Sequence, residues 1–203
     1  MNSRKFTNSL IAGIGLLFGI SATQAATISL LPVSGPVPQG GQETFNLVAN
    51  FGAQSVLSGG TDFSWDASVL SFQSFSFDAS FAPLRDSTFD AKPSGSSNPW
   101  DLQSSSLVTI GFGNFSGISI ATDTVIGTLT FNAIGAPGSS TLISLSDSVK
   151  WAGYYDANSF NPIDVTYTGT TASIAAVPLP ASVWLFLSGL GLLFRTRFKR
   201  TGH

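Results

Sequence analysis

The stretch Thr44-Phe45-Asn46-Leu47-Val48-Ala49-Asn50-Phe51 decides the fold class of this chain. Apolar side chains occupy every second position from Phe45 to Phe51, and most of the positions between them are polar. Successive side chains of an extended strand point to opposite faces, so this period of two predicts a β-strand with one buried face. We therefore expect the chain to build its core from β-sheets.

Comparable patterns on both sides of this stretch predict further strands. They are expected at residues 27–33, 63–65, 69–77, 107–115, 124–134, 140–145 and 163–174. Turn-forming Gly, Pro and Ser residues separate these strands, as at residues 36–41 and 135–138. About eight short strands with such turns predict an all-β, antiparallel β-sandwich of the jelly-roll type over residues 26–176.

Two segments depart from simple alternation. In residues 69–77 the apolar positions change face after Phe72, which predicts a β-bulge near Gln73 and Ser74. Residues 78–106 show no period and contain three prolines and many serines. A stretch of this length without an element is unusual in a compact domain, so it is expected to be functional or partly mobile.

Charge separates the body of the chain from its ends. Residues 26–194 contain eleven acidic and three basic side chains, a net charge of −8, whereas the whole chain carries −2. An acidic body without a basic patch argues against binding to nucleic acid. The chain has no cysteine, so disulfides and thiolate metal sites are excluded and stability must come from packing.

The residue types that catalysis needs are missing from this body. The only histidine is His203, and without a base no serine is distinguished as a nucleophile. Ten of the eleven acidic residues are Asp, mostly beside Ser, Gly, Asn or Pro, where a carboxylate typically caps a turn. We predict that the protein is not an enzyme and uses no cofactor.

One loop carries oxygen ligands of the kind that calcium prefers. Asp156, Asn158, Asn161 and Asp164 lie close together in the sequence. Their spacing lacks the glycine and the terminal glutamate of an EF-hand loop. Turn capping explains the same residues, so two interpretations of this loop stay open.

Four large aromatic residues lie in segments that read as loops, namely Trp100, Trp151, Tyr154 and Tyr155. Exposed flat rings in loops can stack on sugars, which makes these residues candidate carbohydrate contacts. The alternative is packing in or around the core, the common use of large aromatic side chains. The carbohydrate interpretation requires the rings to be exposed and coplanar.

Residues 1–25 have the three parts of a secretory signal peptide. Two basic residues begin it, an apolar run follows at residues 10–20, and small residues precede the predicted cleavage between Ala25 and Ala26. A retained N-terminal anchor is the weaker alternative, because the apolar run is short and ends in a cleavage site. We therefore expect the body to be exported.

Residues 177–203 form a second three-part pattern. It opens with Val177-Pro178-Leu179-Pro180-Ala181, in which both prolines favour an extended backbone, and an uncharged apolar stretch then continues to Phe194. Four cations close the segment, namely Arg195, Arg197, Lys199 and Arg200. The apolar part would reach about 21 Å as a helix, against a bilayer core of roughly 30 Å. This short transmembrane helix suits temporary attachment better than the alternative, a permanent anchor. Basic residues at both chain ends place both ends in the cytoplasm and the body across the membrane.

The C-terminal segment resembles the PEP-CTERM sorting signal of exported proteins from Gram-negative bacteria that make exopolysaccharide. The resemblance rests on Pro178-x-Pro180-Ala181-Ser182, on Trp184-Leu185-Phe186 and Ser188-Gly189-Leu190, and on the basic cluster. It implies processing by an exosortase, an integral-membrane cysteine transpeptidase that recognises the Pro-x-Pro element. Leu179 stands where this family usually has an acidic residue, a variant that leaves the type of exosortase open. The precursor would be held in the inner membrane, and the product would reach the cell surface or extracellular matrix.

The body is similar to cohesin-like domains. The stretch from Gly60 through Asp62-Phe63-Ser64-Trp65-Asp66 to Phe72 resembles a strand that ends in an aromatic-Asp-x-Ser-x-Leu turn. Gly127-Thr128-Leu129-Thr130-Phe131, residues 135–140 and Gly169-Thr170 fit later strands of the same pattern. The resemblance implies a β-sandwich; in cellulosomes such domains bind dockerin modules, while many relatives have no known partner.

These patterns together predict a non-enzymatic exported protein that acts as a structural or adhesive module at the cell surface or in the exopolysaccharide matrix. The alternative is a carbohydrate-binding module that uses Trp100 and the loop from Trp151 to Tyr155. The expected partners are an exosortase, the membrane before processing, and a polysaccharide or another surface protein.

Overall fold

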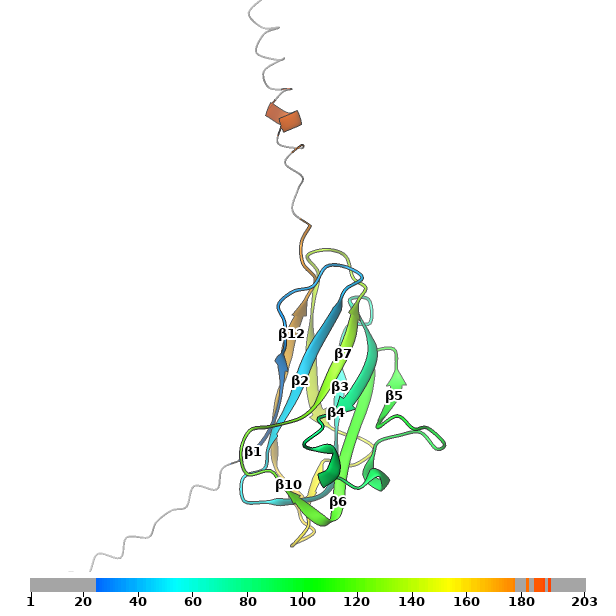
Figure 1. Cartoon of the computed structure of the whole chain (residues 1–203), viewed down its shortest axis with the longest axis vertical. Helices are drawn as coiled ribbons and strands as arrows, with labels where there is room; N and C mark the ends of the chain where they lie inside the picture. The colour runs from blue at the N-terminus through cyan, green and yellow to red at the C-terminus, as the bar shows by residue number, and fades with distance from the viewer. Residues whose placement is uncertain (1–24, 178–181, 183–184, 189, 191–203) are drawn as a thin grey trace, which may run out of the picture.

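The computed structural model describes residues 25–177, 182, 185–188 and 190. Residues 25–177 form a sandwich of two β-sheets (Figure 1). The first sheet has the order β11 (Val165–Thr168), β1 (Ala26–Pro32), β2 (Gln42–Asn50), β7 (Thr124–Ala133) and β4 (Leu70–Phe77). The second has the order β10 (Pro162–Ile163), β9 (Tyr154–Asp156), β3 (Ser55–Ser64), β6 (Leu107–Ser119) and β5 (Trp100–Ser104), and it also includes β8 (Ser140–Asp147) and β12 (Thr170–Ser173).

The strand predicted at residues 44–51 is β2, and its alternating side chains face the core as expected. Phe45, Leu47 and Ala49 are buried in the core, whereas Thr44 and Asn46, which alternate with them on the other face, are only partly buried. Phe45 packs against Phe131 of β7 in a T-shaped arrangement, with ring centroids 5.9 Å apart. The predicted all-β sandwich is confirmed.

The last predicted strand, residues 163–174, is wrong as a single element. It is divided into β10, β11 and β12, and these short strands serve both sheets. Gly169 lies at the crossing between β11 and β12, where an added Cβ would collide with the carbonyl oxygen of Ile143. The pairing is also not wholly antiparallel, because β11 runs parallel to β1. The described residues therefore contain twelve strands rather than about eight.

The bulge expected in residues 69–77 is confirmed. The register of β4 against β7 shifts between Phe72 and Ser74. One extra residue on β4 allows Leu70 and Phe75 to be buried although their spacing is odd. The change of phase in the sequence thus reports a real irregularity of the strand.

Residues 78–106 are more ordered than the sequence suggests. They contain two short 3-10 helices, η1 (Ala82–Leu84) and η2 (Ser87–Phe89), and strand β5. Arg85 forms an ion pair with Asp90, and its guanidinium lies 4.2 Å from the centroid of the Phe77 ring. Tertiary contacts of this kind leave no periodic signal, which is why the sequence showed only a loop.

The predicted processing segments lie almost wholly outside the described residues. The predicted signal peptide covers residues 1–25, of which Ala25 alone is described; Ala26 begins β1 and is buried. Of the sorting motif only Val177 is described, and Pro178, Leu179, Pro180, Ala181 and the basic cluster are not. Residues 182, 185–188 and 190 are helical, and within the part that the structure describes no helix has the length and apolar character needed to span a bilayer.

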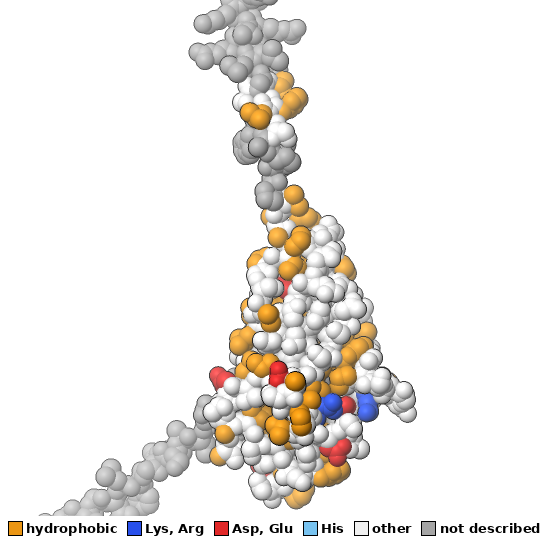
Figure 2. All heavy atoms as spheres, in the orientation of Figure 1, with side chains coloured by type: hydrophobic (Ala, Val, Ile, Leu, Met, Phe, Trp, Pro, Cys, Tyr) orange, Lys and Arg blue, Asp and Glu red, His pale blue; other side chains and the backbone are white. Residues whose placement is uncertain are grey.

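Figure 2 shows where charged side chains gather on one face of the molecule. They lie mainly in the lower half of that view, and the upper half shows little charge, with hydrophobic side chains scattered among uncharged ones. The chain enters the sandwich at the lower end through β1, and it leaves at the upper end after β12 (Figure 1).

A polar cleft on the second sheet as the candidate functional site

A row of polar side chains crosses the outer face of the second sheet. Phe63, Val108 and Ile110 turn inward from β3 and β6 and are buried in the core. The residues that alternate with them turn outward. Asp62 of β3 pairs in register with Thr109 of β6, and Thr109 pairs with Asp101 of β5, which places one polar residue on each of three neighbouring strands.

Asp62 holds the centre of this row although it is only 6% exposed. One carboxylate oxygen accepts a hydrogen bond from Thr109 Oγ1 at 2.6 Å. The other accepts from the backbone N–H of Val149 at 3.1 Å. A buried carboxylate is tolerated when its oxygens are hydrogen-bonded, so Asp62 is a fixed acceptor that ties the turn after β8 to the sheet.

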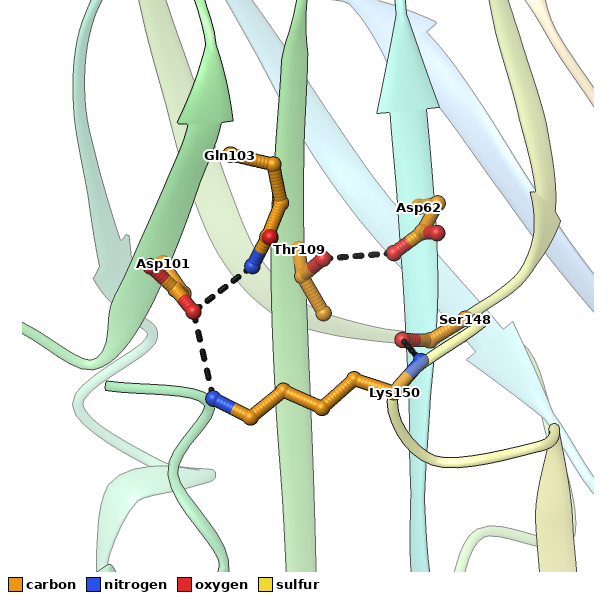
Figure 3. Close-up of polar contacts among 6 residues, drawn as sticks. All are labelled: Asp62, Asp101, Gln103, Thr109, Ser148 and Lys150. Atoms are coloured by element: carbon orange, nitrogen blue, oxygen red, sulfur yellow. Dashed lines mark hydrogen bonds and ion pairs between the residues drawn. The ribbon is translucent and has the colours of Figure 1, made fainter. Parts of the chain in front are cut away.

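Lys150 closes one side of the row. Its side chain extends across β6, and its Nζ donates to Asp101 Oδ2 at 3.1 Å (Figure 3). Gln103 Nε2 donates to the same oxygen at 2.6 Å. Lys150 is nearly half exposed, and an exposed ion pair contributes little to stability, so this amine is free to exchange Asp101 for a partner's acceptor.

These groups line a cleft of about 440 Å³. Its walls are Asp62, Asp101, Gln103, Leu107, Thr109, Val149 and Lys150. Val149 is 92% exposed, and it projects an aliphatic group at the rim of the cleft. The cleft offers carboxylate and amide acceptors, amide and ammonium donors, and the aliphatic side chains of Leu107 and Val149, which is chemistry for recognising the mixed polar and apolar surface of another protein.

Glycines on the outer face explain how the turn lies flat on the sheet. Gly60 and Gly111 are adjacent across β3 and β6. A Cβ on Gly60 would come within 2.7 Å of the Trp151 ring, and one on Gly111 within 3.0 Å of Trp151 Nε1. The absence of side chains lets the indole rest directly on the sheet. Its N–H is buried, and among the described residues it has no hydrogen-bond partner.

The carbohydrate contacts predicted from loop aromatics are not brought together as a platform. The prediction that Tyr154 contacts carbohydrate is wrong. Tyr154 lies in β9, and its ring packs between Phe51 and Phe112, at centroid distances of 5.1 and 5.2 Å. Its side chain is 1% exposed. Trp100 lies in β5 rather than in a loop, and its ring packs on Phe72 at 4.9 Å.

The other two aromatic residues are also engaged or separate. Trp151 is half-buried against the glycines of the sheet, and Tyr155 is half-buried in β9, where it pairs with Pro162. Alternation explains the outcome, because Tyr154 and Tyr155 are neighbours on one strand and point to opposite faces. The exposed, coplanar arrangement that sugar stacking requires is absent from these four described residues.

The candidate calcium loop is a capped turn. Asp156 Oδ1 accepts hydrogen bonds from the backbone N–H groups of Asn158 and Ser159, and Oδ2 accepts from that of Ser55. The hydrogen bonds, led by the one from Ser159, lower the pKa of Asp156. No cluster of three or more His, Cys, Asp or Glu side chains that could hold a metal occurs among the described residues. Turn capping therefore accounts for Asp156, while Asn161 and Asp164 are exposed nearby in the sequence.

The cleft residues could not be grouped from the sequence, because only strand pairing brings them together. Asp62 and Asp101 are 39 residues apart in the sequence, and Asp101 and Lys150 are 49 apart, so only the pairing of distant strands brings them together. A signal was present, since Asp62 is a charged residue within the otherwise uncharged strand β3. Glu43 carried a similar signal in β2, and it is also buried.

A second hollow lies beside the edge strands β4 and β5. It measures about 270 Å³ and is lined by Ala67, Leu70, Ser71, Phe72, Leu102, Ser105 and Ile134. It contains no charged side chain, so it offers shape but little polar specificity.

Comparison with known proteins identifies the fold. No protein-family model and no curated protein sequence matches the chain. Among solved structures, it resembles the sixth cohesin of Acetivibrio cellulolyticus scaffoldin B, solved in complex with a Cel5 dockerin, with a TM-score of 0.53 and 15% identity over 75% of this chain and 99% of that one. A non-cellulosomal cohesin from the archaeon Archaeoglobus fulgidus matches with a TM-score of 0.54 and 18% identity, over 75% and 92% of the two chains.

A third similar structure is the OlpC cohesin of Clostridium thermocellum in complex with the dockerin Doc435. It has a TM-score of 0.56 and 14% identity, over 75% of this chain and 95% of that one. The chain has the cohesin fold. This confirms the cohesin-like sandwich expected from the sequence, and at such low identity the likeness concerns the fold alone.

Proposed function

We propose that this protein is a non-enzymatic binding module whose outer sheet face, centred on the Asp62 cleft, docks a protein partner at the cell surface. The observation that carries the proposal is the row of Asp62, Thr109 and Asp101 across three strands, with Lys150 and Gln103 beside it. The similar cohesins solved in complex with dockerins support a role for this fold in protein binding.

The chemistry of the face favours a protein over other partners. The exchangeable acceptor on Asp101 and the donors on Lys150 and Gln103 suit backbone groups, hydroxyls and charged side chains of another protein. Asp62, with both oxygens bonded inside the module, fixes the turn that carries Lys150. The body carries net charge −8, so a nucleic acid or an anionic polymer would be repelled.

The second part of the proposal concerns export. A signal peptide cut between Ala25 and Ala26 would leave a mature chain that begins with the first residue of β1. The segment from Val177 to Arg200 would then act as the PEP-CTERM-like signal, and an exosortase would move the module from the inner membrane to the cell surface or extracellular matrix. The module would be structural or adhesive there.

Blocking the cleft tests the binding surface. In Gln103→Trp, a bulky indole would fill the cleft from the solvent side, where Gln103 is exposed. Ser76→Trp is the matched control, because Ser76 is exposed on β4 of the other sheet. Binding of each labelled, purified protein to source cells that lack their own copy would be measured as a function of concentration.

We expect saturable binding that is lost after mild protease treatment of the cells, weakened at least tenfold by Gln103→Trp, and unchanged by Ser76→Trp. Binding that survives protease but is lost after periodate oxidation would favour the carbohydrate alternative instead. Equal binding of both variants would remove the cleft from the proposal.

A further inference from the structure

Charge is segregated along the long axis of the sandwich. The end where the chain leaves for its C-terminal segment consists of residues 33–41, 65–69, 104–106, 134–139 and 174–177. These loops are joined by backbone hydrogen bonds, for example from Gly138 N–H to Ile174 and from Ala175 N–H to Val37. We call this surface the exit end; Asp66 is its only charged residue.

The opposite end holds most of the charge. Eight charged residues lie in its loops and strand ends, namely Asp78, Arg85, Asp86, Asp90, Lys92, Asp123, Asp156 and Asp164. The view in Figure 2 shows the same asymmetry on the face that it presents. Charged side chains are common on protein surfaces that face only water. The near absence of charge at the exit end therefore needs a physical explanation.

The exit end also exposes aliphatic side chains. Those at or next to its loops are Leu31, Val33, Ile134, Leu142 and Val177, each between 46% and 69% exposed. Proline and glycine fill much of the remaining sequence, as in Gly35-Pro36-Val37-Pro38 and Ala136-Pro137-Gly138. An uncharged surface with projecting aliphatic groups suits the boundary between lipid headgroups and acyl chains.

The chain itself limits how far this end can lie from a membrane. Val177 is the last residue of the sandwich, and the uncharged apolar stretch begins at Ala181. Four residues span at most about 14 Å. If the apolar stretch is inserted, the exit end must stand within that reach of the lipid surface.

We propose that the exit end rests on the lipid bilayer while the precursor is attached, with Val33, Ile134 and Leu142 contacting the headgroup region. This inference rests on the proposed membrane attachment of the C-terminal segment. Charges brought against a low-dielectric slab lose hydration, and an end with Asp66 alone minimises that cost. Burial of the three aliphatic groups favours contact.

The proposed orientation has a consequence for the rest of the module. The ten residues of β3 run beside the whole of β6, so at a rise of about 3.3 Å per residue the sandwich stands roughly 30 Å tall along this pair. The charged end would then lie far from the membrane. The Asp62 cleft, on the side of the sandwich, would stay open to a partner during attachment.

Site-specific quenching tests this contact directly. The chain has no cysteine, so Val33→Cys and Phe115→Cys each create a unique labelling site. Both positions are exposed, and Phe115 lies near the charged end of β6 as the matched control. The membrane form of the chain, with its mature N-terminus verified by mass, would be labelled with a fluorophore and reconstituted into phosphatidylcholine vesicles that contain a lipid with a nitroxide on its headgroup.

We expect quenching of the label at position 33 and none at position 115. A second comparison places the label at Leu142→Cys and adds two aspartates elsewhere. Val33→Asp with Ile134→Asp puts charge on the exit end and should abolish quenching of that label. Phe115→Asp with Phe160→Asp puts the same charge away from the exit end and should leave the quenching unchanged. Flotation of the chain with the vesicles is measured in the same samples.

Flotation without quenching at position 33 would overturn this inference and leave the membrane attachment standing. Protection of position 33 from an aqueous quencher, without quenching by the lipid, would show that a second protein copy covers the exit end, and it would also overturn the inference. A chain that does not float would overturn the membrane attachment and this inference together.

Discussion

The hydroxyl of Tyr154 lies 3.0 Å from Thr61 Oγ1, and both residues are completely or almost completely buried between the sheets. Burial raises the pKa of Tyr154, so the phenol stays neutral. Near this pair, Tyr167 of β11 donates to Asp147 Oδ1 at 2.6 Å. The Tyr154–Thr61 contact is enclosed by the core, where each hydroxyl depends on the other for a partner, whereas the Tyr167–Asp147 contact is at the surface.

Replacing one member of this pair should cost more than replacing both. Tyr154→Phe leaves Thr61 Oγ1 buried without its partner, and Thr61→Val does the same to the phenol, so each should lower the free energy of unfolding by about 1–3 kcal/mol. In the double variant neither group is stranded, and the loss should be smaller than the sum of the two single losses. Urea denaturation of the four proteins measures this; simple additivity would contradict it.

Gly59 is expected to be the least replaceable glycine of β3. An added Cβ would overlap the Tyr154 ring and lie 2.7 Å from the Gly153 carbonyl oxygen. Gly59→Ala should therefore destabilise the fold by about 3 kcal/mol or more, since neither backbone nor ring can move cheaply. Gly35→Ala is the control, because nothing lies within 4 Å of that position, and its melting temperature should stay near that of the parent protein. Similar losses at both sites would show that this packing is not tight.

Glu43 should make the protein less stable as pH rises. Burial raises its pKa above the usual 4.5, an effect partly offset by a backbone hydrogen bond from Ser173, and Oε2 has no partner among the described residues. Between the usual and the raised pKa the folded state holds a proton that the unfolded state has released, so stability falls with pH across that window. Glu43→Gln should remove the fall and raise stability at neutral pH.

Asp66 provides a control of opposite sign for this measurement. Hydrogen bonds from Ser68 lower its pKa, so its contribution is present above the usual pKa of 3.8 and is lost as pH falls through the lowered value. Asp66→Asn should flatten the acid side of the stability profile and leave the Glu43 window unchanged. Denaturation curves over a pH series measure both effects. If the free energy of unfolding of Glu43→Gln changed with pH in parallel with that of the parent, the role given to Glu43 would be contradicted.

Asp62 should control the mobility of the turn after β8. Asp62→Ala removes the acceptor for Val149 N–H and strands the buried Thr109 hydroxyl, so a loss of about 1–3 kcal/mol and faster hydrogen exchange in residues 148–152 are expected. Asp101→Ala removes the exposed pair with Lys150 and should cost less than about 1 kcal/mol. Hydrogen exchange followed by mass spectrometry distinguishes them, and unchanged exchange in Asp62→Ala would show that the turn is held by other contacts.

The sorting prediction is testable by mass. In its native cell the protein should yield a mature species that begins at Ala26 and ends near Pro180. Replacing Pro178 and Pro180 by Ala should abolish it, because the extended recognition element would be lost. Intact mass and cell fractionation provide the readout. A species that retains Arg200 in the inner membrane, with or without the prolines, would favour a permanent anchor.

The sandwich was predictable where side-chain pattern and strand coincide. Residues 44–51 and the phase change after Phe72 were enough to predict β2 and the bulge of β4. Residues 100–104 were missed, because β5 is an edge strand in which Trp100 is only partly buried and Leu102 is exposed, so its side chains show no clear alternation. Residues 163–174 were predicted as one strand in error. The chain passes from one sheet to the other within this stretch, and the apolar pattern continues across that point.

The candidate site could not be predicted in the same way. Trp100, Trp151, Tyr154 and Tyr155 were grouped because aromatic residues in apparent loops suggest a surface, yet neighbours on one strand face opposite sides. The cleft depends on the register of β3 against β6 and of β6 against β5, and register is a property of paired strands rather than of any one of them.

Local pattern along the chain thus settled the fold class, the bulge, the acidic body and the terminal segments that predict export, because each depends on side chains within a few residues of one another. Tertiary structure decided which carboxylates share a surface, which aromatic rings are buried, and at which end of the sandwich charge is absent. The physical reason is that antiparallel pairing joins residues far apart in sequence, and their burial and hydrogen bonds exist only once the strands have paired.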